Sequence, residues 1–166
     1  MHPRRTRLTT RGAVALVALV VGFAACGGVN GGDGGDGRLS KEKSVEEAND
    51  ICAASSAQIV ELGAPSLADP VAVEAAVAQT VAIQTHAYRQ LRALEGPRRD
   101  EPGIKAWLRN VKAAVEQMDA VRQGLADGDR AAIDEATQKG AAFTADAEDF
   151  ADAYGLNECS TTDDSQ

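Results

Sequence analysis

Residues that could carry out catalysis are scarce in this 166-residue chain. Histidine occurs twice, and beyond the first 25 residues only His86 remains. Ser55 or Ser56 could join His86 in a catalytic relay, but no nucleophile-elbow motif accompanies them. The Glu and Glu-x-x-His motifs of di-metal bundles are missing, and zinc and haem lack ligands. We therefore expect no catalytic residues, no metal, no cofactor and no enzymatic activity.

Acidic residues dominate the chain, which has a net charge of −8. When the four arginines of residues 1–25 are set aside, 13 basic residues face 25 acidic ones, a net charge of −12. Such a protein should not bind nucleic acid through phosphate attraction. Asp146, Asp149 and Asp152 recur at steps of three, and we expect them to form a solvated acidic helix face.

One basic cluster stands out against this acidic background. It could hold an anionic ligand or dock an acidic partner. Alternatively, its cations complement the negative end of a helix dipole and pair with acids on neighbouring helices. The cluster consists of His86, Arg89, Arg92, Arg98 and Arg99.

Three polar residues fall on helix faces that we expect to be buried, namely Ser55, Thr80 and Gln84. They could line a small pocket in the core. The alternative is that the two hydroxyls bond to carbonyls of the preceding helical turn.

Residues 1–25 have the pattern of a secretory signal that is removed after export. Four arginines precede about a dozen apolar residues, a run too short to cross a bilayer, and small residues follow it. The Arg4-Arg5 pair keeps twin-arginine export open as an alternative, although the flanking residues favour general secretion.

The stretch Ala24-Ala25-Cys26 resembles the bacterial lipobox, with Phe23 where that pattern prefers an aliphatic residue. The resemblance implies a diacylglyceryl group on the Cys26 thiol and cleavage before this residue. Two acyl chains would hold the protein stably on the outer face of the cytoplasmic membrane. The alternative is a chance cysteine beside an ordinary cleavage site. Residues 26–39 are glycine-rich, and we expect a flexible tether there.

Residues 40–159 carry the helical signal. Apolar residues recur at alternating steps of three and four, and no strand pattern occurs. Ser44 and Glu47 form a possible capping box for the first helix, whose buried face runs to Ile59 and Leu62. Asp69-Pro70 is a good start for the second helix.

Three breaks divide the segment into four helices of roughly 22–27 residues, within the range of bundle helices. The breaks are Gly63-Ala64-Pro65, Gly96-Pro97 and Asp127-Gly128-Asp129. The predicted fold is all-α, an up-down-up-down four-helix bundle, followed by a disordered tail at residues 160–166.

If Cys26 is lipidated, Cys52 and Cys159 remain as a pair. In an up-down-up-down bundle the first helix begins, and the fourth ends, at the same pole. We therefore expect a Cys52–Cys159 disulfide that closes a loop of about 100 residues. The alternative, two free thiols, is less typical of exported proteins.

The chain also resembles a group of small actinobacterial lipoproteins and secreted proteins that share a C…YGLxxC frame. The matching residues are Ile51-Cys52 and the closing segment Tyr154-Gly155-Leu156-Asn157-Glu158-Cys159. Here Ser160 follows the last cysteine, where members of the group often have glycine. The resemblance implies architecture and location, and no activity.

Two functions fit these features. The first hypothesis is a lipid-tethered, non-enzymatic module that binds another cell-envelope component through the basic cluster. The alternative is a lipoprotein that binds a small molecule in the bundle core or at His86, Arg89 and Arg92.

Overall fold

A computed structural model describes residues 37–160 of the chain. The predicted signal segment at residues 1–25, the lipidation site Cys26, most of the tether and the tail beyond Ser160 lie outside the described residues.

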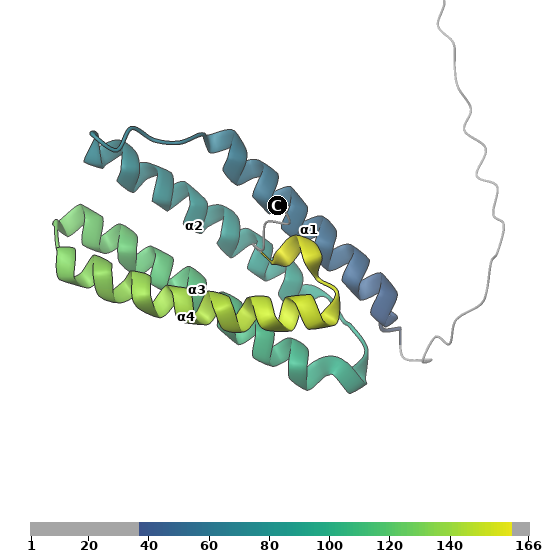
Figure 1. Cartoon of the computed structure of the whole chain (residues 1–166). Helices are drawn as coiled ribbons and strands as arrows, with labels where there is room; N and C mark the ends of the chain where they lie inside the picture. The colour runs from purple at the N-terminus through teal and green to yellow at the C-terminus, as the bar shows by residue number, and fades with distance from the viewer. Residues whose placement is uncertain (1–36, 161–166) are drawn as a thin grey trace, which may run out of the picture. The chain divides into compact units, whose positions relative to one another are not determined.

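The fold is all-α, as predicted, and four long helices pack in the order of the chain (Figure 1). α2 packs on α1, α3 on α2 and α4 on α3, an arrangement consistent with an up-down bundle. No helix among residues 37–160 is both long and apolar enough to cross a membrane. The elements are α1 (Lys41–Leu62), α2 (Pro70–Ala93), η1 (Arg98–Asp100), α3 (Glu101–Asp127), α4 (Arg130–Tyr154) and η2 (Asn157–Cys159).

Local sequence accounts for most helix ends. The Asp69 carboxylate accepts hydrogen bonds from the first backbone N–H groups of α2 and caps it, as predicted. Gly128 ends α3 with a φ of 67°, a left-handed conformation that glycine adopts without a Cβ clash. Asp129 then caps α4 by accepting a hydrogen bond from the Ala132 N–H.

The predicted capping box at Ser44 and Glu47 is wrong. The N-cap of α1 is Ser40, whose hydroxyl oxygen accepts a hydrogen bond from the Lys43 N–H at 3.3 Å. Ser44 lies inside the helix, where it is buried and donates its hydroxyl to the Ser40 carbonyl at 2.9 Å. The helix begins a full turn earlier because Ser40 offers an equally good cap before the apolar pattern starts at Val45.

The packed core lies at the end of the bundle where α1 begins and α4 ends, which we call the disulfide end. Trp107 of α3 is buried there and stacks on Phe150 of α4, with 6.1 Å between ring centroids. The Trp107 Nε1–H is buried without a hydrogen-bond partner among the described residues. The buried members of this core are Ala48, Cys52, Leu91, Trp107, Leu108, Ala147, Ala151 and Leu156. All of them lie between Val45 and Cys159.

The opposite end, around the α1–α2 connection, is loosely covered. Val60, Leu67 and Val71 are 78%, 89% and 75% exposed. Leu62, predicted on the buried face of α1, is 36% exposed. The periodicity of α1 continues to this end, but α3 and α4 do not come close enough to cover it.

A disulfide joins Cys52 of α1 to Cys159 of η2, as predicted, with 5.1 Å between their Cα atoms. Two further bonds reinforce this junction. The Asn49 side-chain amide donates to the Gly155 carbonyl at 3.2 Å, and its oxygen accepts from the Glu158 N–H at 3.1 Å. The backbone of α1 runs close to α2 and η2 and approaches α3 and α4 far less. η2 therefore bridges α1 to the end of α4.

Removal of this disulfide should strongly destabilise the fold. The cysteines are 107 positions apart, and a loop of about 100 residues is worth up to about 4.7 kcal/mol in the chain-entropy account. We expect the double variant Cys52→Ala/Cys159→Ala to lose about 2–5 kcal/mol of unfolding free energy. Urea denaturation followed by fluorescence of Trp107, the sole tryptophan, measures this loss. A reductant should lower the unfolding free energy of the wild type to that of the variant, and it should leave the unfolding free energy of the variant unchanged. A wild type insensitive to reduction would contradict the prediction.

Candidate functional site

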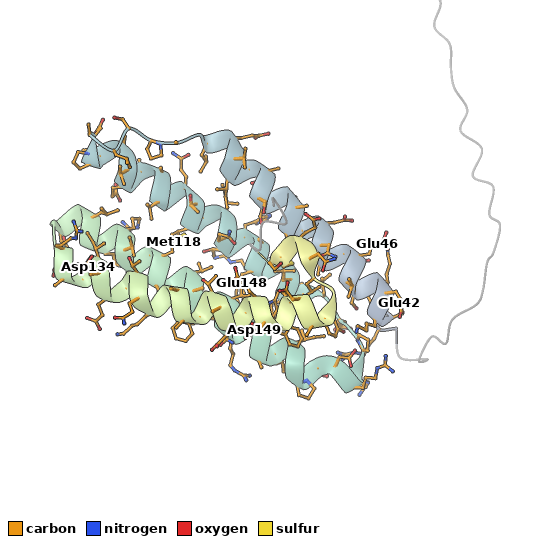
Figure 2. All side chains as sticks on the ribbon, viewed as in Figure 1. Glu42, Glu46, Met118, Asp134, Glu148 and Asp149 are labelled. Atoms are coloured by element: carbon orange, nitrogen blue, oxygen red, sulfur yellow. A yellow bond between two sulfur atoms is a disulfide. The ribbon has the colours of Figure 1, made fainter. Side chains whose placement is uncertain are left out.

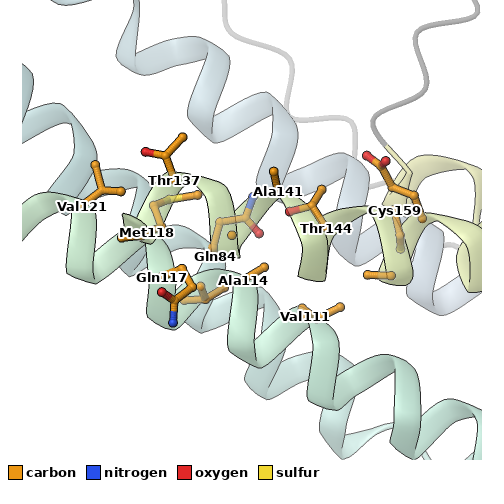
Figure 3. Close-up of a pocket in the computed structure, with 15 residues that line it drawn as sticks. Gln84, Val111, Ala114, Gln117, Met118, Val121, Thr137, Ala141, Thr144 and Cys159 are labelled. Atoms are coloured by element: carbon orange, nitrogen blue, oxygen red, sulfur yellow. The ribbon is translucent and has the colours of Figure 1, made fainter. Parts of the chain in front are cut away.

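A groove of about 370 Å³ runs along the bundle between α2, α3 and α4 (Figure 3). Most of its wall comes from facing side chains of α3 and α4, and α1 contributes none of the described lining residues. Val121 and Cys159 lie at opposite ends of the side chains labelled in Figure 3. The groove therefore reaches the Cys52–Cys159 junction.

Small residues on α3 and α4 account for the hollow. Ala114 of α3 and Gly140 and Ala141 of α4 line it, and each leaves space that a larger side chain would fill. A Cβ on Gly140 would lie 3.3 Å from the Gln117 Cβ, so the two helices approach closely there. The small residues thus explain both the close approach of α3 to α4 and the shallow wall of the groove.

The three predicted pocket residues have different positions. Ser55 and Thr80 donate their hydroxyls to the Cys52 and Ala76 carbonyls, at 2.9 and 3.0 Å. Both hydroxyls thus bond to the preceding helical turn, which was the alternative to lining a pocket. Gln84 lines the groove. Its side-chain amide has no hydrogen-bond partner among residues 37–160, so it can bond to a bound molecule.

The predicted basic cluster is fully on the surface. His86, Arg89 and Arg92 project from the last turns of α2, and Arg98 and Arg99 belong to η1; all five are exposed. Arg99 Nε lies 3.5 Å from Asp100 Oδ1. Arg89 and Arg92 form no ion pair within residues 37–160, so pairing with neighbouring acids does not explain these two cations. A shared binding role for the five residues stays a prediction.

The structure also shows cations that the cluster omitted. Lys105, Arg109 and Lys112 are exposed along α3. Lys105 pairs with Glu101 and Lys112 with Glu116, each four residues apart on the helix. The hydrogen bond from Lys105 holds the pKa of Glu101 below its ordinary value, and the Glu116 carboxylate raises the pKa of Lys112. Their spacing of four and three residues was the sequence signal for a shared helix face.

The acidic residues of α4 follow the expected pattern. Asp146, Asp149 and Asp152 are all exposed. In the part of the chain that the structure describes, no three histidine, cysteine, aspartate or glutamate residues are grouped to hold a metal ion.

A polar contact closes the disulfide end. Tyr154 Oη donates to Asp100 Oδ2 at 3.0 Å, and Lys41 Nζ lies 4.4 Å from the centre of the tyrosine ring. Burial, followed by the hydrogen bond to the Asp100 carboxylate, raises the pKa of Tyr154 to about 12. The contact joins the end of α4 to the start of α3.

No protein-family model, curated protein or solved structure matches this chain. The resemblance through the C…YGLxxC frame therefore stays a prediction.

The stability of the fold should decrease in strong alkali through Tyr154. In the unfolded chain a tyrosine loses its proton near pH 10, whereas the folded state keeps it until about pH 12. Tyr154 therefore contributes fully below pH 10, and its contribution falls as the pH rises from 10 to 12. Urea titrations at several pH values should show a shallower alkaline decline for Tyr154→Phe than for the wild type. If the unfolding free energies of the wild type and Tyr154→Phe decline equally in alkali, the Tyr154 hydroxyl does not cause the alkaline loss of stability.

Proposed function

We propose that this chain is a lipid-anchored, extracytoplasmic binding module whose groove holds a small, uncharged and mostly apolar molecule. The observation that carries the proposal is the groove between α2, α3 and α4. Its volume of about 370 Å³ falls within the roughly 300–1,000 Å³ of small-molecule sites. Its wall is mainly apolar with a few polar groups, which is the usual composition of such sites.

The lining favours an uncharged ligand. The described lining residues include Glu148 but no lysine, arginine or histidine that could neutralise an anion. The acidic composition of the chain adds to this bias. Val111 and Met118 offer apolar contact, while the Gln84 amide and the Thr144 hydroxyl can form hydrogen bonds. The ligand would thus combine an apolar body with one or two neutral polar groups.

Two features support the location outside the cytoplasm. The sequence of residues 1–26 has the features of a lipoprotein signal, and the Cys52–Cys159 disulfide is typical of an oxidising compartment. The lack of a catalytic motif in the sequence supports binding rather than catalysis. Docking of an envelope protein at Arg89 and Arg92 remains the second candidate, because these exposed cations have no ion pair in the described chain.

A matched pair of probes, 1-octanol and octanoate, tests the groove. Octanol should raise the melting temperature progressively with the logarithm of its concentration, by about 5 °C at tenfold excess over its Kd, and octanoate should have little effect. Ala114→Phe and Thr144→Phe, which fill the groove, should abolish the shift. Ala145→Phe is the matched control, since Ala145 is exposed on α4 outside the groove. Equal octanol shifts in all three variants would refute binding in the groove.

Membrane attachment has a separate test. In a bacterium that processes lipoproteins, the wild type should be in the membrane fraction and carry fatty-acid mass on Cys26. Cys26→Ser should move the protein to the soluble extracytoplasmic or culture fraction, because the acyl chains provide the anchor. If Cys26→Ser remains in the membrane fraction, a lipid on this residue is not the anchor.

A further inference from the structure

Five exposed cations lie on the neighbouring helices α2 and α3. Arg89 and Arg92 belong to α2, and Lys105, Arg109 and Lys112 to α3. We call these five residues the α2–α3 basic face. The neighbouring residues of each helix, such as Leu91 and Leu108, meet in the same core cluster, which places the two groups at the same level of the bundle.

Helix geometry puts the cations of α2 beside α3. Glu74 of α2 accepts a hydrogen bond from Arg122 of α3 at 3.2 Å, so the Glu74 side of α2 faces α3. Arg92 follows Glu74 by eighteen positions, about five complete turns, and therefore lies on the same side.

The cations of α3 lie on the side of the helix away from the groove. Met118 lines the groove, and the cations lie far around the helix from it: about 140° for Lys105, 180° for Arg109 and 120° for Lys112. The α2–α3 basic face and the groove therefore occupy nearly opposite sides of α3.

This face carries unbalanced positive charge. Lys105 and Lys112 each pair with one glutamate, and the exposed Glu95 follows Arg92 by three positions. Arg89, Arg92 and Arg109 form no ion pair within residues 37–160.

Acidic side chains line other parts of the bundle; Figure 2 shows Glu42 and Glu46 on α1, and Glu148 and Asp149 on α4. From Gly140 to Tyr154, α4 has four acidic residues and no lysine or arginine. The domain is therefore electrostatically polarised.

The chain enters the bundle next to this face. The Leu39 N–H donates to the Glu95 carbonyl at 2.8 Å, and Arg38 Nε donates to the Gly96 carbonyl at 2.6 Å. Arg38 also lies 3.5 Å from Glu101, the partner of Lys105. These contacts fix Leu39 and Arg38 to the α2–α3 connection. Only eleven positions separate Cys26 from Gly37, which bridge at most about 40 Å.

We infer that the α2–α3 basic face lies against the anionic lipid headgroups of the membrane that holds the anchor. The inference rests on the proposed anchoring at Cys26. A short connection keeps the face at high effective concentration near the headgroups, and the unpaired arginines attract their phosphates. The same surface repels the acidic end of α4. The domain therefore has one orientation on the membrane, with the α2–α3 basic face toward the lipid headgroups.

Chemical coupling at Cys26 provides the test. With the disulfide formed, Cys26 is the remaining thiol of residues 26–166 and can be attached to maleimide lipids in vesicles. An impermeant amine-reactive ester then labels lysines on phosphatidylglycerol or on phosphatidylcholine vesicles, and mass spectrometry quantifies each site. On phosphatidylglycerol, labelling of Lys105 and Lys112 should fall at least threefold, while the exposed Lys139 of α4 keeps its labelling. About 0.5 M salt should restore the labelling by screening.

Charge reversal provides the matched variants. Arg89→Glu/Arg109→Glu should lose the protection of Lys105 and Lys112, whereas Arg130→Glu, at an exposed position of α4, should keep it. Equal labelling of Lys105 and Lys112 on both vesicle types overturns the inference and leaves the face to an acidic protein partner. Because the attachment is synthetic and the groove is on the other side of α3, octanol binding and native lipidation succeed or fail independently of this result.

Discussion

One covalent link reinforces the attachment of α1. Three helices, α2 to α4, pack consecutively, while α1 has close backbone contact mainly with α2 and η2. Cys52–Cys159 joins α1 to the end of the chain, and Asn49 adds two hydrogen bonds at the same place. A domain with few aromatic residues gains little from ring packing, so a cross-link that restricts the unfolded chain has unusual weight.

This link also explains why the bundle is uneven. Side chains around Cys52 and Trp107 are well packed, because η2 fills the space between α1 and α4 at that end. Toward the α1–α2 connection no described element fills this space in the same way, and Val60 and Val71 are exposed. The groove lies between the well-packed disulfide end and the loosely covered end at the α1–α2 connection. Its presence follows from small residues on α3 and α4 and from the position of α1, which does not cover it.

Sequence reasoning succeeded where the determinants are local. The cap at Asp69 and the break at Asp127-Gly128-Asp129 follow from the chemistry of single residues, and the structure has both. Leu156 is 2% exposed and its N–H bonds to the Ala151 carbonyl, so the YGL segment turns the chain back toward Cys52. The disulfide could be predicted because topology alone brings the two ends together. The N-cap of α1 was misplaced, since two serines four residues apart offered similar signals.

Features that depend on how helices face one another were missed. Trp107 was not recognised from the sequence as a core residue, yet it packs against Phe150 in the core. Arg109 was left out of the predicted basic cluster because it belongs to α3, and the sequence alone does not show that α3 packs beside α2. Gln84 was identified as a possible pocket residue, but the groove itself required the positions of Ala114 and Gly140 on separate helices.

The sequence separation of Cys52 and Cys159 has a consequence for biogenesis. If the chain is exported as proposed, amino end first, Cys52 would reach the oxidising side 107 residues before its partner. The disulfide could then form only once Cys159 has followed, and until that point the Cys52 thiol would be open to other oxidants or to foreign cysteines.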